Sequence, residues 1–168
     1  MDPIYFQRKG YPQYRFLSNF HEAPQVWHHV SESPAGTVTV SRTFATNEHY
    51  YQAMKCYSWQ EWFNKIWLAP TPKDAKVLGS QCPMEPGWEK PCQCGCGYLM
   101  KEHVMLDGLF MKFEQNPELA KQLLATGDRE LIEYAPWGDT YWGVNKDLEG
   151  RNLLGKMLMK VRQTLSLR

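Results

Sequence analysis

Three polar side chains in the stretch TNEHYYQAMK, residues 46–55, have types and spacing that suit work on a substrate. If the stretch is helical, Glu48, Gln52 and Lys55 return to nearly the same side, because each residue turns about 100°. The resulting stripe offers a carboxylate, an amide and an amine. Two interpretations stay open at this point: a surface ladder worth a few tenths of a kcal/mol, and one wall of a pocket.

A second group of polar and aromatic residues lies in the stretch PWGDTYWGVNKDLEGRN, residues 136–152. Its members are Trp137, Asp139, Tyr141, Trp142, Gly143 and Asn145, with Gly138 and Gly150 beside them. Loops of this length in compact domains are usually functional or disordered, and the aromatic residues argue against disorder. The sequence therefore predicts an ordered loop that either contacts a substrate or covers the core.

A weaker candidate is the stretch RFLSNFHEAP, which places Asn19 between Phe16 and Phe20. One ring could stack on a base while the amide forms hydrogen bonds with it. Plain core packing is the alternative interpretation.

The five cysteines include three in the stretch CQCGC, namely Cys92, Cys94 and Cys96. An odd number of cysteines in a chain without a secretory signal favours free thiols over a disulfide framework. Together with Cys82 or His103, these thiols could instead form a metal or redox site in a module without catalysis. Because C-x-C-x-C fits a zinc tetrahedron badly compared with C-x-x-C, we expect no metal.

The elements that must position these residues are predicted from periodicity and from capping residues. Strand-like runs occupy residues 4–8, 25–30 and 37–45, the last with the alternation of a half-buried strand. The stretch SESPAG between the second and third runs is typical of a turn. A further short strand is predicted in ELIEYA, residues 130–135.

Helices are predicted from residue 46 onward. Thr46 can cap the helix that carries the polar stripe, and Thr71, followed by Pro72 and Asp74, can cap the next one. Gly79 is expected to end that second helix. Apolar spacing predicts three more helices, at residues 98–116, from 117 to about 126 and at 153–165.

Length and composition predict one helix-rich α+β domain, residues 1–168, with a few short strands. The chain can bury a sizeable core, and 43% apolar residues with a formal net charge of +1 argue against disorder. That charge provides no global field to attract nucleic acid or a membrane. Neither a secretory signal nor an apolar run of membrane-spanning length is visible, so we expect a cytoplasmic protein.

The motifs FLSNF, TNEHYYQAMK, TPKDAKVLG, GWEK, DTYWG and GRNLLGKMLMKVR, taken in this order, closely resemble the NADAR, or YbiA-like, family. The resemblance runs from about Phe16 to Leu165. Its most specific part is the E-H-Y-x-Q-A-x-K helix followed by D-x-x-W-G and G-x-N-x-L-G. This resemblance implies a YbiA-like fold and the chemistry of an N-glycosidase.

What the resemblance implies is cleavage of the bond between a phosphorylated ribose and an amino-substituted base. The substrates would be ADP-ribosylated guanine, free or in nucleic acid, or early riboflavin-pathway intermediates. The matching catalytic positions are Glu48, Lys55 and Asp139, and the matching substrate-binding positions are Asn19, Phe20, Trp88, Trp142, Gly143 and Asn152. Neither a cofactor nor a metal is expected in the chemistry. The alternative is a metal-binding, or nucleic-acid- or ADP-ribose-binding, module without catalysis.

The sequence departs from the family pattern after the second helix, where Ser80 stands in place of a common arginine. Phosphate contacts at this position are therefore in doubt. Arg151 and Arg42 become replacement candidates, because a guanidinium suits phosphate and Arg151 opens a helix.

Physical chemistry explains why these residue types suit the reaction. Breaking a ribosyl C–N bond builds positive charge on the sugar and negative charge on the base, so carboxylates near C1′ help. Glu48, in a first helical turn, is favoured in its ionised form by the helix dipole and by Lys55. Lys55 itself could attack C1′ as a neutral amine or contact phosphate as an ammonium, while Trp88 and Trp142 offer flat surfaces for the base.

Overall fold

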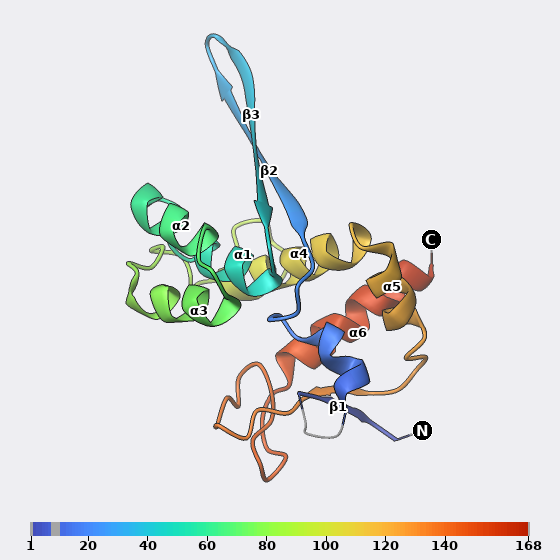
Figure 1. Cartoon of the computed structure of the whole chain (residues 1–168). Coiled ribbons are helices and arrows are strands. Elements are labelled where there is room, and N and C mark those ends of the chain that lie inside the picture. The colour runs from blue at the N-terminus through green and yellow to red at the C-terminus, as the bar shows by residue number, and fades with distance from the viewer. Residues whose placement is uncertain (1, 8–10, 168) are drawn as a thin grey trace. The chain divides into compact units, whose positions relative to one another are not determined.

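The computed structural model describes residues 2–7 and 11–167, which contain seven helices and four strands (Figure 1). In chain order these are β1 (Ile4–Phe6), the 3-10 helix η1 (Pro12–Leu17), β2 (Gln25–Ser33), β3 (Gly36–Phe44), α1 (Asn47–Met54), α2 (Gln60–Trp67), α3 (Pro72–Gln81), α4 (Met100–Glu114), α5 (Pro117–Leu124), β4 (Leu131–Glu133) and α6 (Leu153–Ser166). The helix-rich α+β class is confirmed. Arg8, expected in the first strand, lies outside the described residues.

The chain forms two compact units. One, the terminal unit, comprises Met1–His21 with Asn116–Arg168, and the other, the central unit, comprises Glu22–Gln115. That the whole chain behaves as a single domain stays a prediction. Within the described residues, no helix is both long enough and apolar enough to cross a membrane.

The terminal unit is built on a two-stranded parallel sheet. β1 pairs with β4, with Ile4 opposite Leu131 and Phe6 opposite Glu133, and α6 packs against β4 and α5. The predicted apolar face of the last helix is confirmed, since Leu154, Leu158 and Val161 are buried. Their burial fixes α6, and with it the loop that precedes this helix.

The central unit begins with the β2–β3 hairpin, which projects from the helices as a long ribbon (Figure 1). Ser33 still pairs with Gly36, so the turn is shorter than the predicted SESPAG. The strand predicted at residues 37–45 is confirmed, but its predicted half-burial is wrong over most of its length, because the described residues leave most of β3 uncovered. Val30 and Val38 remain 58% and 52% exposed.

Helix α1 packs against α2, α3 and α4. The predicted caps are confirmed: the side chain of Thr46 accepts a hydrogen bond from the His49 N–H, and that of Thr71 accepts one from the Asp74 N–H. The predicted stop at Gly79 is wrong, because α3 continues to Gln81. Gly79 is needed inside α3, where a Cβ would overlap the Gln52 side chain.

Two short helices, η1 and α2, were not predicted from the sequence. Helix α2 has a signal that could have revealed it, since Phe63 and Ile66 are buried three residues apart and Glu61 pairs with Lys65 at i, i+4. A helix of eight residues depends on tertiary packing more than on propensity, so this local pattern is weak.

Candidate active site

Every residue of α1 is buried, including its polar ones. Glu48 is 6% exposed and Gln52 is 8% exposed. Burial of polar side chains costs free energy unless they form hydrogen bonds. A solvent-exposed ladder is therefore excluded, and the stripe faces the protein interior.

Glu48 lies in the first turn of α1, as expected, where the helix dipole favours a carboxylate. Gln52 Nε2 donates a hydrogen bond to Glu48 Oε1 at 2.8 Å. The other end of the amide, Gln52 Oε1, is buried against Gly79 and accepts no hydrogen bond from the described residues. Gln52 therefore orients Glu48 and is itself held by the close approach of α3.

Lys55, at the C-cap of α1, is half-buried and is directed at α3. Its Nζ donates to the carbonyl oxygen of Gly79 at 2.7 Å, in the last turn of α3. Lys55 forms no ion pair with Glu48 in the described part of the chain, so the expected effect of its charge on Glu48 stays a prediction. A cation at this point is favoured by the dipole of α3, because the carbonyl groups of the last turn carry partial negative charge.

His49, beside Glu48 in the chain, has both ring nitrogens engaged. Nδ1 lies 2.8 Å from Thr46 Oγ1 and Nε2 lies 3.1 Å from the Ala69 carbonyl oxygen. Burial lowers the pKa of His49, and the hydrogen bond to Ala69 opposes this shift only in part. A neutral ring that donates from Nε2 fits these contacts, so His49 fixes the start of α1.

Cys56 follows Lys55 and is fully buried. Burial raises the pKa of its thiol to about 12, and the neighbouring Cys82 adds to the shift. A thiol with this pKa is protonated at neutral pH and is a poor nucleophile. Cys56 is therefore a packing residue.

Trp88 is 2% exposed and packs against α1. Its ring centroid lies 5.2 Å from that of Tyr51, at an interplanar angle of 54°. This contact supports the helix that carries Glu48. The expected role of Trp88 in stacking on a base stays a prediction.

The loop between β4 and α6, in the terminal unit, is organised by Asp139. Its Oδ1 accepts hydrogen bonds from the backbone N–H groups of Tyr141 and Trp142, at 3.1 and 3.0 Å. The two rings meet edge to face with centroids 5.2 Å apart, and the Arg151 guanidinium lies 4.6 Å from the Tyr141 ring centroid. The loop is folded, as the aromatic content predicts.

Asn152 and Gly143 have structural explanations in this loop. Asn152 has a left-handed backbone with φ of 49°, and its amide accepts from Glu133 N at 3.0 Å and donates to Leu131 O at 2.9 Å. A Cβ on Gly143 would collide with the Glu133 carbonyl oxygen. Both residues join the loop to β4, which favours a scaffold role over direct substrate contact.

The remaining candidate site residues differ in how much of each side chain is exposed to solvent. Phe16 is 5% exposed and belongs to the core, Asn19 is 7% exposed, and Phe20 is 38% exposed. Arg42, on β3, lies with its guanidinium carbon 4.8 Å from the Trp67 ring centroid. Glu48, Lys55, Trp88 and Arg42 thus belong to the central unit, and the other candidates, Asn19, Phe20, Asp139, Trp142, Gly143, Arg151 and Asn152, belong to the terminal unit.

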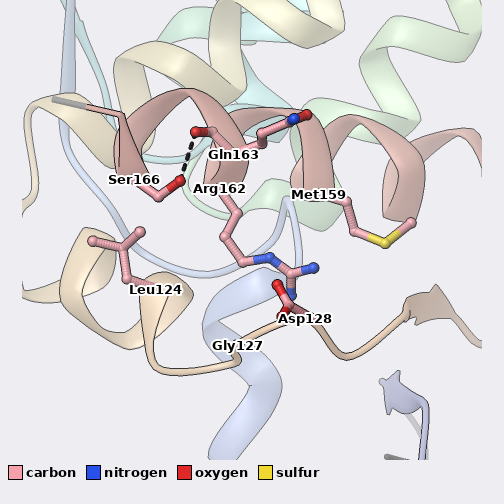
Figure 2. A pocket seen from close by; sticks show the side chains of 7 residues that line it. All are labelled: Leu124, Gly127, Asp128, Met159, Arg162, Gln163 and Ser166. Carbon is pink, nitrogen blue, oxygen red and sulfur yellow. Dashed lines mark hydrogen bonds between the residues drawn. The ribbon is translucent and has the colours of Figure 1, made fainter.

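A cavity of about 360 Å³ lies in the terminal unit (Figure 2). The residues that line it include none of the predicted site residues. Leu124, Gly127, Asp128, Met159, Arg162, Gln163 and Ser166 line it. Arg162 Nη1 donates to Thr126 Oγ1 at 2.7 Å and to the Arg129 carbonyl oxygen at 2.9 Å. These hydrogen bonds hold the Arg162 guanidinium to the turn that follows α5. No pattern in the sequence predicted this cavity.

Comparison with known proteins defines the class to which this fold belongs. The NADAR domain family matches residues 5–166. The NMR structure of the Escherichia coli protein YbiA superimposes with a TM-score of 0.74 at 30% identity, covering 99% of this chain and 86% of that one. The chain belongs to the NADAR family, as the sequence motifs predict.

Two curated relatives describe the activities found in this family. N-glycosidase YbiA of Escherichia coli (strain K12) is 31% identical over 168 residues, 98% of each chain. A riboflavin biosynthesis protein of Vibrio vulnificus (strain YJ016) is 35% identical over 97% of this chain and 38% of its own length. The expectation of a hydrolase acting on N-glycosyl bonds is confirmed at the level of the family.

Proposed function

We propose that this chain hydrolyses the N-glycosyl bond between a phosphorylated ribose and an amino-substituted base. The observation that carries the proposal is the buried carboxylate of Glu48 in the first turn of α1, oriented by the Gln52 amide at 2.8 Å. Membership of the NADAR family supports it. A buried carboxylate is costly to maintain, and catalysis is a physical reason to maintain one.

Glu48 supplies what the transition state of this reaction requires. As the C–N bond breaks, positive charge develops at C1′ of the ribose, and a nearby carboxylate stabilises it or orients the attacking water. The hydrogen bond from Gln52 holds the carboxylate in one orientation, so little reorganisation is needed during the reaction. Asp139 is proposed as a second carboxylate in the same chemistry, on the strength of the family motif.

Lys55 is proposed to act as a positioning cation and not as a covalent nucleophile. Its Nζ donates to the Gly79 carbonyl oxygen at the end of α3, so the amine is engaged with that helix end and is not directed into open space for attack on C1′. Borohydride added during turnover tests the assignment. A sugar-phosphate adduct on Lys55, absent in Lys55→Arg, would establish a Schiff base and overturn it.

The proposed substrates are ADP-ribosylated guanine and early riboflavin-pathway intermediates. The name of the Vibrio vulnificus relative supports the second, and both contain a base joined to a phosphorylated ribose. The cytoplasmic location and the absence of a cofactor from the chemistry stay predictions of the sequence.

Incubation of the full chain with each substrate, followed by chromatography of the released base, tests the function. Glu48→Gln provides the control, since it keeps the side-chain volume and removes the charge. Release of base from one substrate by the unaltered chain alone supports the proposal. Equal release by Glu48→Gln, or none from either substrate, contradicts it.

A further inference from the structure

Four ligand-type side chains outside the candidate active site converge where the segment between α3 and α4 meets the first turn of α4. Cys92, Cys94, Cys96 and His103 each direct one ligand atom to a common point, with all four atoms within 4.8 Å of one another. His103 Nδ1 lies 3.4 Å from Cys96 Sγ and 3.7 Å from Cys94 Sγ. Cys92 Sγ lies 2.9 Å from Cys94 Sγ.

We propose that these four residues bind one structural Zn²⁺ ion. Zinc–sulfur and zinc–nitrogen bonds of about 2.3 and 2.05 Å place the S and N corners of a tetrahedron about 3.6 Å apart. The two sulfur–nitrogen distances match that edge. The Cys92–Cys94 pair must open by about 0.9 Å to reach the sulfur–sulfur edge of about 3.8 Å, a movement within the reach of side-chain rotation.

The loop conformation explains how C-x-C-x-C spacing can supply three corners, contrary to the sequence expectation. Gly95 and Gly97 have φ values of +75° and +81°, which residues other than glycine rarely adopt. Gly95 N donates to the Cys92 carbonyl oxygen at 3.2 Å, and Cys92 N donates to the Tyr98 carbonyl oxygen at 2.8 Å. These turns fold the three thiols onto one side, and His103 on α4 supplies the fourth corner.

Zinc-binding histidines usually donate their second ring N–H to a carboxylate or a carbonyl group, and Asp107 is placed to accept it from His103. Its Oδ2 lies 3.0 Å from His103 Nε2, one turn further along α4. A carboxylate that accepts the Nε2–H fixes the ring and directs Nδ1 at the metal. The same Nδ1 is the atom that faces Cys94 and Cys96. Soft thiolates with one imidazole favour zinc over magnesium or calcium.

The ion would hold together a segment that has little core of its own. Residues 93–97 are exposed, and a single bridge between Pro91 and Leu99 closes the segment. Its base carries Trp88, whose carbonyl oxygen accepts from Lys101 N at 3.1 Å. With four protein ligands the ion has no open position for substrate. Its role is therefore to stabilise the fold, separately from the hydrolysis proposed for Glu48.

Metal analysis of the full chain, purified without added metal and without chelator, tests the proposal. We expect about one zinc per chain, and Co²⁺ replacement should give the intense visible bands of a tetrahedral thiolate site. Cys96→Ser and His103→Ala should lose the bound metal. Cys82→Ser is the matched control, because Cys82 Sγ contacts the Gly79 carbonyl oxygen and not the cluster; it should keep one zinc per chain.

Asp107→Asn provides a second test that leaves all four ligands in place. Loss of the outer carboxylate should lower zinc affinity about 10–100-fold, measured by competition with a chromophoric chelator. Absence of zinc, a Cys92–Cys94 disulfide in its place, iron or copper in its place, or loss of zinc in Cys82→Ser would each overturn the proposal.

Discussion

Helix α1 and the loop at residues 136–152 both carry residues predicted to do chemistry, but they hold them in different ways. In α1 the helix and the Thr46 cap pair backbone groups, and the side chains of Glu48 and Gln52 bond to each other. In the loop some backbone groups pair with one another, as Arg151 N does with the Thr140 carbonyl oxygen at 2.8 Å, and side chains supply further partners. Asp139 accepts two backbone N–H groups, and Asn152 bridges to two backbone groups of β4.

This difference separates two reasons for finding a polar residue in a functional motif. A polar side chain in a loop can be required by the loop itself, since buried backbone groups must be paired. In α1 the Glu48 carboxylate is held by another side chain, since it accepts a hydrogen bond from the Gln52 amide. Glu48 is therefore the stronger catalytic candidate, and substitutions that keep the hydrogen bonds while removing charge can test the distinction.

The largest expected effect belongs to Glu48→Gln. Loss of the carboxylate should reduce kcat by about 10²–10⁴-fold, while KM changes little and the fold is kept because the amide preserves the volume. Steady-state kinetics and circular dichroism provide the measurements. Activity equal to that of the unaltered chain would show that burial of this residue serves structure alone.

Asp139→Asn tests whether the loop carboxylate has a second task. The amide oxygen of asparagine can still accept from the N–H groups of Tyr141 and Trp142, so the free energy of unfolding should fall by only about 1 kcal/mol. A catalytic carboxylate would nevertheless cost about 10²-fold in kcat, and we expect that loss. Full activity in Asp139→Asn, combined with instability in Asp139→Ala, would assign Asp139 to the scaffold.

Trp142→Ala should act mainly on binding. Stacking of a base on an aromatic ring contributes about 1–3 kcal/mol, so KM should rise roughly tenfold or more while kcat is kept, because stacking is the same in ground and transition states. Initial rates over a wide substrate range separate the two constants. A loss confined to kcat would place Trp142 in the chemical step.

The smallest effect concerns His49 and pH. Burial holds the pKa of His49 below its ordinary value of 6.5. As the pH falls below about 6.5, the unfolded chain therefore binds more protons than the folded chain does. The free energy of unfolding should therefore decrease on acidification below pH 6.5. Urea titrations between pH 5 and 8 measure this slope, which should be flatter in His49→Gln; an unchanged slope would assign it to other groups.

Local signals in the sequence predicted much of the scaffold. Thr46 and Thr71 cap their helices because capping depends on neighbouring residues alone. The role of Gly79 could not be predicted, because it depends on how closely α3 approaches Gln52. Lys55 was placed beside Glu48 by spacing, whereas tertiary packing offers it a carbonyl group of α3.

The alternation of residues along the chain also failed to predict which side chains are buried. The alternation in residues 37–45 correctly predicts a strand, but the strand belongs to a projecting ribbon and not to a covered sheet. The thiol cluster shows the same dependence on distant residues, since His103 joins it only through the fold of residues 92–99.

Glycine at position 79 has a consequence for the entropy of substrate binding. Gln52 is confined between the α3 backbone and Glu48, so its side chain has lost its rotamer freedom before any substrate arrives. The conformational entropy of ordering this pair, up to about 2 kcal/mol per long side chain, is therefore lost during folding. At the active site proposed above, substrate would meet a carboxylate that is already preorganised, and its binding energy could be used on the reacting bond.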